Sequence, residues 1–256
     1  MARRRYGPYV ADRPPTPDDA RAVAAPERLA VVRRRIDDAA TAAGRDPAEV
    51  RLLVATKTLP IGVVRAAVAG GATLLGENRV QELIAHAPAL ADLDPTWHLI
   101  GHLQSNKVAA ALDWVQCVQS VDSLALAERL SRRCAALGRD LDVMVQVNVS
   151  GEPSKFGVPP DAAASFAADI AALPHLRLVG FMTIGANTPD EDEVRLGYAR
   201  LRQVRDDVVG SGLPGTQGAR ELSMGMSGDL EPAIAEGATI VRVGTAVFGA
   251  RPPGRP

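Results

Sequence analysis

The chain has 256 residues, of which 46% are hydrophobic and 23% charged, with a formal net charge of −1. This length fits one large α/β barrel or two small domains, and the charge balance gives no basic excess of the kind that indicates nucleic-acid binding. No apolar run approaches the roughly 18 residues of a membrane span, and no signal sequence follows the basic residues 3–5. We therefore expect a cytoplasmic protein that binds neither nucleic acid nor membrane, with Cys117 and Cys134 as buried thiols.

Residues 1–43 are predicted to form a tail followed by one helix. Residues 1–24 combine prolines and charges without periodicity, which indicates a disordered tail. Over residues 26–43, Leu29, Val32, Ile36 and Ala40 recur on one helical face, and Gly44 is expected to end this helix.

Residues 50–57 predict a buried strand that ends at a lysine. The apolar run at residues 52–55 is typical of a parallel strand buried on both faces. Lys57 closes the strand, and Pro60 suits the first turn of the helix that follows.

Beyond Lys57 the chain alternates between helical and strand-like segments. Strands are predicted at residues 73–75, 97–100, 114–118, 141–149, 176–181, 220–223 and 239–243. Helices are predicted at residues 61–69, 80–91, 106–112, 122–137, 160–172, 191–209 and 229–236. Eight strand–helix units in about 200 residues favour a single (β/α)8 barrel of the TIM type, with a doubly wound sheet as the alternative. The predicted organisation is a tail at 1–24, one barrel at 25–251 and a short tail at 252–256.

Lys57 is one of only three lysines among 29 lysines and arginines, the others being Lys107 and Lys155. A lysine at the carboxyl end of a barrel strand points to the face where such barrels place their sites. Unlike arginine, its amine can be neutral and form a Schiff base with an aldehyde. The simpler interpretation is a lysine that marks where the strand reaches water.

A phosphate site is predicted after the seventh and eighth strands, where barrels commonly bind this group. Residues 223–229 (SMGMSGD) follow the seventh strand, and Gly244 and Thr245 follow the eighth. Glycines let backbone N–H groups approach an anion, and the hydroxyls of Ser227 and Thr245 add donors. Asp229 would repel phosphate, so we expect it to cap the next helix. With Lys57, this predicts a phosphorylated aldehyde held as an imine, or a sugar-phosphate aldolase.

Several segments, in this order, closely resemble the pyridoxal phosphate homeostasis protein family. They are the pair Lys57-Thr58, residues 76–82 (GENRVQE), 97–107 (WHLIGHLQSNK), 222–227 (LSMGMS) and 242–249 (RVGTAVFG). The resemblance covers residues 26–251 and implies a barrel like the N-terminal domain of alanine racemases.

The resemblance implies a site for pyridoxal 5′-phosphate (PLP), which Lys57 would bind covalently as an aldimine. The other cofactor-binding residues that it implies are Ser227, Gly244 and Thr245 at the phosphate with Gly228 nearby, Arg242 facing the pyridine nitrogen, and Asn78 flanking the ring. Met224 is expected either to fill the core or to line the cofactor wall. An arginine at the ring nitrogen weakens the cofactor as an electron sink. From its position alone, Arg242 is equally interpreted as a strand arginine paired with a carboxylate.

The function implied by the resemblance is intracellular PLP homeostasis without turnover. The protein would be a monomer with no catalytic residues, carrying PLP and supplying it to apo forms of PLP-dependent enzymes. One alternative is a PLP-dependent amino acid racemase, which needs a second acid–base group from an extra domain for which we expect no room. Another is a Schiff-base aldolase, which predicts sugar-phosphate turnover and no bound chromophore.

The remaining polar residues have simpler interpretations. His98 and His102 have the i, i+4 spacing of metal-binding helices, but they fall on a predicted strand and its exit loop, so no metal is expected. Lys107 and Lys155 are secondary aldehyde sites or surface amines. Glu77 is a general base or the partner of a nearby cation, and Tyr198 falls on a predicted outer helix, away from Lys57.

Overall fold

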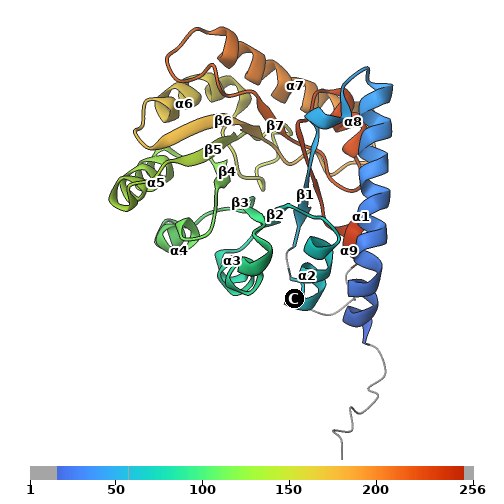
Figure 1. Ribbon diagram of the computed structural model, residues 1–256. Coiled ribbons are helices and arrows are strands. Elements are labelled where there is room, and N and C mark those ends of the chain that lie inside the picture. Colours follow the sequence, from blue (N-terminus) through green and yellow to red (C-terminus); the bar gives the residue numbers. More distant parts are fainter. Residues whose placement is uncertain (1–15, 57, 251–256) are drawn as a thin grey trace, which may run out of the picture.

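The computed structural model describes residues 16–56 and 58–250, and within these ranges eight parallel strands close into a barrel in the order β1 to β8 (Figure 1). The predicted (β/α)8 fold is confirmed, and the doubly wound alternative is wrong because β8 pairs with β1. The strands are β1 (Arg51–Ala55), β2 (Leu74–Glu77), β3 (Thr96–Leu99), β4 (Cys117–Val121), β5 (Leu141–Gln146), β6 (Leu176–Met182), β7 (Glu221–Ser223) and β8 (Ile240–Val243).

Helices connect successive strands on the outside of the barrel, as Figure 1 shows. The α-helices are α1 (Pro17–Ala42), α2 (Ile61–Ala69), α3 (Val80–His86), α4 (Val108–Leu112), α5 (Leu124–Leu137), α6 (Pro160–Ala171), α7 (Glu191–Gly210), α8 (Leu230–Ala235) and α9 (Thr245–Phe248). Short 3-10 turns lie at η1 (Pro47–Glu49), η2 (Pro88–Leu93) and η3 (Ser105–Lys107). None of the helices in the described ranges is long and apolar enough to cross a membrane.

The first helix begins earlier than the sequence pattern predicts. α1 starts at Pro17, so residues 17–24, predicted as part of a disordered tail, are helical. Thr16 and Asp19 form a capping box at this end, in which each side chain bonds the other residue's backbone N–H. Pro26 resembles a first-turn proline but lies inside the helix. Residues 1–15 of the predicted tail lie outside the described residues.

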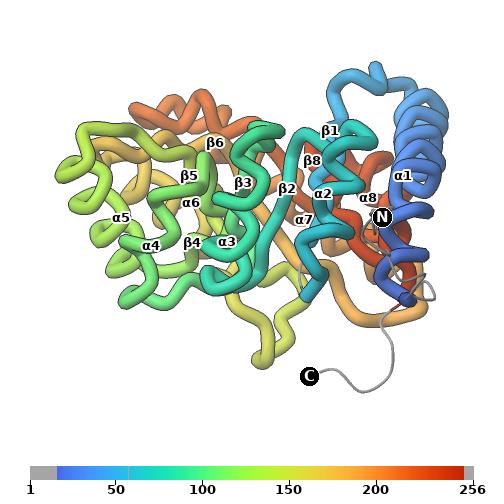
Figure 2. The backbone as a smooth tube through the Cα atoms, turned by 60° about the horizontal axis from the view of Figure 1, so that its bottom comes forward, coloured from blue at the N-terminus to red at the C-terminus, as the bar shows by residue number. Residues whose placement is uncertain are grey.

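Long helix α1 covers the side of the barrel where the last two helices are short. It packs against α2, α8 and α9, on the opposite side of the molecule from α5 (Figures 1 and 2). Its predicted apolar face, Leu29, Val32, Ile36 and Ala40, is buried, which confirms that pattern and explains why the helix persists through Pro26.

Several other boundaries differ from the prediction, and two of these differences have clear local causes. The strand predicted at 114–118 is shifted to β4, because the N–H groups of Trp114 and Val115 extend α4 by bonding the Ala111 carbonyl. The helix predicted at 80–91 splits, because Pro88 begins η2 and cannot continue the α-helical bonding of α3. The fifth strand ends at Gln146, three residues before its predicted end.

Side chains from the strands alternate between two buried layers. Leu53, Leu74, Cys117, Met144, Met182 and Ile240 pack together inside the barrel. Their strand neighbours, such as Val54, Leu75 and Val241, pack in the larger layer between barrel and helices. By this alternation Gly76, Gln119 and Arg242 belong to the interior, whereas Glu77 belongs to the outer layer. Cys117 and Cys134 are buried free thiols, as predicted, and burial raises the pKa of both.

Candidate functional site

Lys57 itself lies outside the described residues, but the residues on either side of it are placed. The Thr56 N–H donates to the Gly76 carbonyl at 3.0 Å, one residue beyond the end of β1, and its side chain is buried. Thr58 is exposed and has a positive φ of 61°. The backbone on both sides of Lys57 is therefore at the carboxyl end of the barrel, the end predicted from sequence.

The loops after β7 and β8 meet at this same end. Ser227 Oγ accepts a hydrogen bond from the Ala246 N–H at 3.2 Å, which joins the two loops. Ser227 is partly exposed, and Gly228 and Thr245 are exposed. Because Ser227 accepts with its oxygen, its hydroxyl hydrogen is left to donate to a ligand.

Gly244 brings these loops against the end of β1. A Cβ at Gly244 would lie 3.1 Å from the Ala55 carbonyl oxygen, closer than an ordinary contact. The structure therefore gathers the four residues predicted at the phosphate, Ser227, Gly228, Gly244 and Thr245, beside the strand that leads to Lys57.

Asp229 does not cap α8 as predicted, since its side chain makes no bond to that helix. Its carboxylate instead accepts from the Met226 N–H and from the Tyr198 hydroxyl, the latter at 2.7 Å. Tyr198 is on helix α7 as predicted, but its side chain is fully buried and reaches the β7–α8 loop. Burial, followed by the charge of Asp229, raises the pKa of Tyr198.

Arg242 lies inside the barrel and is 6% exposed. One of its terminal nitrogens donates to the Ser223 carbonyl at 2.6 Å and to Ser223 Oγ at 2.9 Å, and the other donates to the Thr183 carbonyl at 2.6 Å. These hydrogen-bond partners are neutral oxygens; among the described residues no carboxylate lies within salt-bridge distance of Arg242, and Asp229 acts on it through its charge alone. Burial lowers the pKa of Arg242, although an arginine remains charged at neutral pH.

A chain of polar side chains extends from Arg242 across the barrel interior. Ser223 Oγ donates to Gln119 Oε1 at 2.6 Å, and Gln119 Nε2 lies 2.8 Å from His98 Nδ1. Because the amide nitrogen donates, His98 accepts as a neutral ring, and burial lowers its pKa to about 3. The sequence did not indicate a role for Gln119 or Thr183, because their contacts are with residues of strands that are distant along the chain.

Asn78 and Met224 are placed differently from each other. Asn78 follows β2 and is partly exposed, with its backbone carbonyl against Gly101. Met224 is fully buried and packs in the layer between barrel and helices. The structure therefore does not bring the Met224 side chain to the group formed by Ser227 and Thr245, and we do not retain it in the site.

Gly101 is required for the position of Asn78, and alanine there should destabilise the fold. A Cβ at Gly101 would lie 2.2 Å from the Asn78 carbonyl oxygen, so the backbone must shift. We expect Gly101→Ala to lower the free energy of unfolding in urea by about 2 kcal/mol or more, as overpacking does. Gly62→Ala is the matched control, because no described atom lies within 4 Å of its added Cβ. Equal stability of the two variants would contradict this reading of Gly101.

The two other lysines have contacts of their own. Lys155 Nζ donates to Glu152 Oε1 at 2.6 Å and to the Gly185 carbonyl at 2.8 Å. Lys107 ends η3 and is partly exposed. In the segment between β5 and α6, which carries Lys155 and projects from the barrel in Figure 2, Phe156 stacks on His102 with ring centroids 4.1 Å apart. His98 and His102 thus make separate contacts, one inside the barrel and one at its rim.

Glu77 is buried and paired, as one of its two predicted interpretations requires. Its Oε1 accepts from Thr56 Oγ1 at 2.6 Å and lies 2.7 Å from His86 Nδ1. His86 and its neighbour Glu82 carried no signal that distinguished them from ordinary helix residues. The side chain of Glu77 is 0% exposed, so it is not available as a general base for a ligand.

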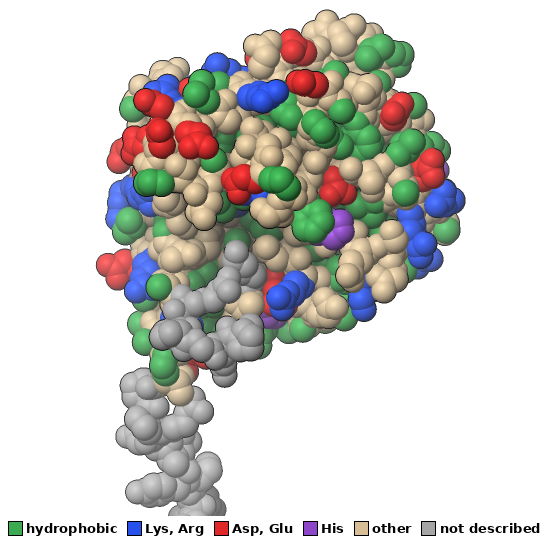
Figure 3. All heavy atoms as spheres, turned by 180° about the vertical axis from the view of Figure 1, so that it is seen from behind, with side chains coloured by type: hydrophobic (Ala, Val, Ile, Leu, Met, Phe, Trp, Pro, Cys, Tyr) green, Lys and Arg blue, Asp and Glu red, His purple; other side chains and the backbone are tan. Residues whose placement is uncertain are grey.

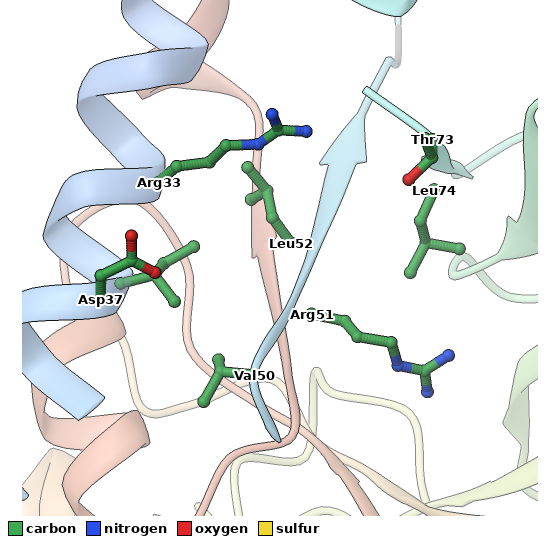
Figure 4. A pocket seen from close by; sticks show the side chains of 8 residues that line it. Arg33, Asp37, Val50, Arg51, Leu52, Thr73 and Leu74 are labelled. Carbon is green, nitrogen blue, oxygen red and sulfur yellow. The ribbon is translucent and has the colours of Figure 1, made fainter. Parts of the chain in front are cut away.

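The surface pocket drawn in Figure 4 lies at the other end of the barrel. It has a volume of about 280 Å³ between α1 and the amino ends of β1 and β2, with Arg33 and Asp37 on one side of β1 and Arg51 on the other (Figure 4). Because it faces away from the loops after β7 and β8, we do not assign it to the predicted site.

Figure 3 shows acidic and basic side chains scattered over one face of the molecule.

Comparison with known proteins agrees with this fold. The sequence model for the alanine racemase N-terminal domain matches residues 28–252. The chain superposes on alanine racemase from Corynebacterium glutamicum with a TM-score of 0.65 at 19% identity, covering 88% of this chain and 62% of that chain. At this identity the likeness concerns the fold alone.

Two relatives are similar over nearly their whole length. A pyridoxal phosphate homeostasis protein of Pseudomonas aeruginosa is 47% identical over 230 residues, which is 90% of this chain and 97% of that protein. The structure of PipY from Synechococcus elongatus with PLP bound has a TM-score of 0.77 and 37% identity, covering 88% of this chain and 99% of that chain.

Proposed function

Because this chain belongs to the pyridoxal phosphate homeostasis proteins, within the alanine racemase N-terminal domain family, we propose that it binds PLP through Lys57. The observation that carries the proposal is the meeting of the β7 and β8 loops, with Ser227 and Thr245, beside the end of the strand that precedes Lys57. An aldehyde on a phosphorylated ligand held there would be within reach of that lysine. The covalent bond forms between the lysine amine and the aldehyde carbon, with loss of water.

The residues present suit PLP. Ser227 and Thr245 offer hydroxyl donors to a phosphate, and Gly228 and Gly244 leave the backbone of both loops open to it. Asn78, which follows the carboxyl end of β2, would flank the ring. Arg242, held by Ser223 and Thr183, would present a fixed positive charge toward the ring nitrogen. When bound, PLP supplies a reactive aldehyde and an electron-withdrawing ring, which this arginine would weaken.

We further propose that the protein carries PLP for homeostasis and does not turn over amino acids. Apo forms of PLP-dependent enzymes are the recipients in this proposal, and the carrier acts as a monomer in the cytoplasm. A racemase needs a base at the substrate Cα proton. Among the residues that the structure describes, Tyr198 is the one tyrosine. Its hydroxyl donates to Asp229, so it is not available as a base. Glu77 is fully buried and bonded to Thr56 and His86.

The test is hydrogen exchange at Cα of added amino acids. The PLP-loaded protein, incubated with alanine or serine in D2O, should show no α-deuteration by NMR above that of free PLP. Deuteration near the usual enzymatic range of about 1 s⁻¹ or above, abolished by Lys57→Ala, would establish a PLP enzyme instead. Turnover of a sugar phosphate with no bound chromophore would favour the aldolase.

A further inference from the structure

A chain of four buried polar side chains crosses the interior of the barrel. It runs from Arg242 on β8 through Ser223 on β7 and Gln119 on β4 to His98 on β3, so it joins opposite sides of the closed barrel (Figure 1). Ser223 and Gln119 are 0% exposed, and His98 and Arg242 are 5% and 6% exposed. Polar groups buried this deeply are unfavourable unless each of them is hydrogen-bonded. Apolar side chains fill the rest of the interior, so the presence of this chain requires an explanation.

Arg242 fixes the direction in which hydrogen bonds are donated along this chain. A guanidinium only donates, so Ser223 Oγ accepts from Arg242 at 2.9 Å and must direct its own hydrogen elsewhere. Its other partner among the described residues is Gln119 at 2.6 Å, whose carbonyl oxygen is the atom that accepts. The amide nitrogen of Gln119 then faces His98 Nδ1 at 2.8 Å. Because an amide nitrogen donates, Nδ1 accepts, and the ring proton of His98 lies on Nε2.

Every bond in the chain is therefore donated in the same direction, from the arginine to the histidine. Successive bonds of this kind polarise one another, and a buried network with every member satisfied is rigid. Burial also lowers the pKa of His98 to about 3, which agrees with a neutral ring that accepts at Nδ1. The Ser223 hydroxyl and the Gln119 amide are thus oriented from both ends of the chain.

The chain also determines which donors of Arg242 remain free. Of the five N–H groups of its guanidinium, two bond the Ser223 carbonyl and hydroxyl oxygens, and a third bonds the Thr183 carbonyl. The Nε–H and one terminal N–H have no acceptor among the described residues. Because the guanidinium is planar, fixing both terminal nitrogens also fixes the direction of the Nε–H bond.

We propose that His98, Gln119 and Ser223 are positioning residues, which hold the guanidinium of Arg242 in one orientation so that its free N–H donors face the ring nitrogen of bound PLP. The consequence for PLP rests on the proposed function, whereas the direction of the hydrogen bonds and their hold on Arg242 do not. None of the three side chains needs to touch the ligand for this role.

The direction of the chain is tested by the proton on His98 in the full-length protein without PLP. In ¹⁵N NMR spectra of the histidine rings, the signals of His98 are those that disappear in His98→Leu. Between about pH 5 and 8, the range in which an ordinary histidine titrates, its Nδ1 should have the shift of an unprotonated nitrogen and its Nε2 that of a protonated one. A proton on Nδ1, or titration of the ring within this range, would overturn the proposal.

The hold on Arg242 is tested by hydrogen exchange of its Nε–H, also without PLP. This signal is assigned by its absence in Arg242→Lys. Gln119→Leu and Ser223→Ala should each accelerate the exchange at least about tenfold, as expected when a buried hydrogen bond is lost. Met144→Leu is the matched control, because Met144 lies in the same interior and leucine nearly conserves its volume. Wild-type exchange in Gln119→Leu, or equal acceleration in Met144→Leu, would contradict the proposal.

Loading the same variants with PLP that carries ¹⁵N at its ring nitrogen connects the chain to the cofactor. In wild type this nitrogen should be unprotonated, because Arg242 presents a positive charge to it. Gln119→Leu should move its shift toward the protonated value, and Met144→Leu should leave it unchanged. An unmoved shift in Gln119→Leu would overturn the role of the chain toward PLP. If wild type bound no PLP, the proposed function would fail, and the His98 and Arg242 signals would still decide whether the chain holds the arginine.

Discussion

Lys57→Arg should abolish covalent PLP binding while leaving the fold intact. Arginine keeps the positive charge but does not form an imine with an aldehyde at neutral pH. Purified wild type loaded with PLP should be yellow, and the variant should show no visible absorption beyond that of free PLP. Circular dichroism and the unfolding midpoint should stay close to those of wild type, because β1 ends at Ala55, before the substituted position.

Lys107→Arg is the matched control for this loss. Lys107 lies at the end of η3 on a different loop, so its replacement should leave the colour unchanged. Loss of colour in Lys107→Arg with retention in Lys57→Arg would move the covalent site to the other lysine.

Ser227→Ala combined with Thr245→Val should weaken PLP far more than pyridoxal, which lacks the phosphate. Each hydroxyl bond to a charged group contributes roughly 1.5–3 kcal/mol, so the pair should raise the dissociation constant for PLP by about 100-fold or more. The added alanine and valine side chains are no larger than the originals, and Thr245 is exposed, so packing is preserved.

Pyridoxal provides the internal comparison for that variant. Its affinity, measured by the same absorption titration, should change less than about tenfold, since its aldehyde and ring are unaltered. Equal weakening of both ligands would show that the phosphate lies elsewhere or that the loops have been distorted. The loss of the Ser227 acceptor for Ala246 N–H makes the unfolding midpoint a necessary check.

The barrel was predictable because its signal is local and repeated. Apolar runs of strand length alternate with helical periodicity, and the carboxyl ends of adjacent parallel strands share one face. For the same reason the loops carrying Ser227 and Thr245 could be predicted to meet. The start of α1 was missed because residues 1–24 combine prolines and charges without apolar periodicity, although Thr16 and Asp19 carry the capping-box pattern.

Contacts between segments that are distant along the chain could not be predicted from the sequence. Nothing in the local pattern around Tyr198 shows that its hydroxyl reaches Asp229, 31 positions away. The bond from Arg242 to the Thr183 carbonyl likewise depends on the strand order, which places β6 and β8 on either side of β7. Asp229 was expected to serve its own helix, and its carboxylate instead turns to a residue of α7.

The most direct test of the central proposal is the chemical site of PLP attachment. Borohydride reduction of the PLP-loaded protein converts an imine to a stable amine and fixes the mass of the cofactor on one peptide. After digestion, mass spectrometry should place that mass on the peptide that contains Lys57. Its appearance only on peptides containing Lys107 or Lys155, or on no peptide at all, would contradict the account.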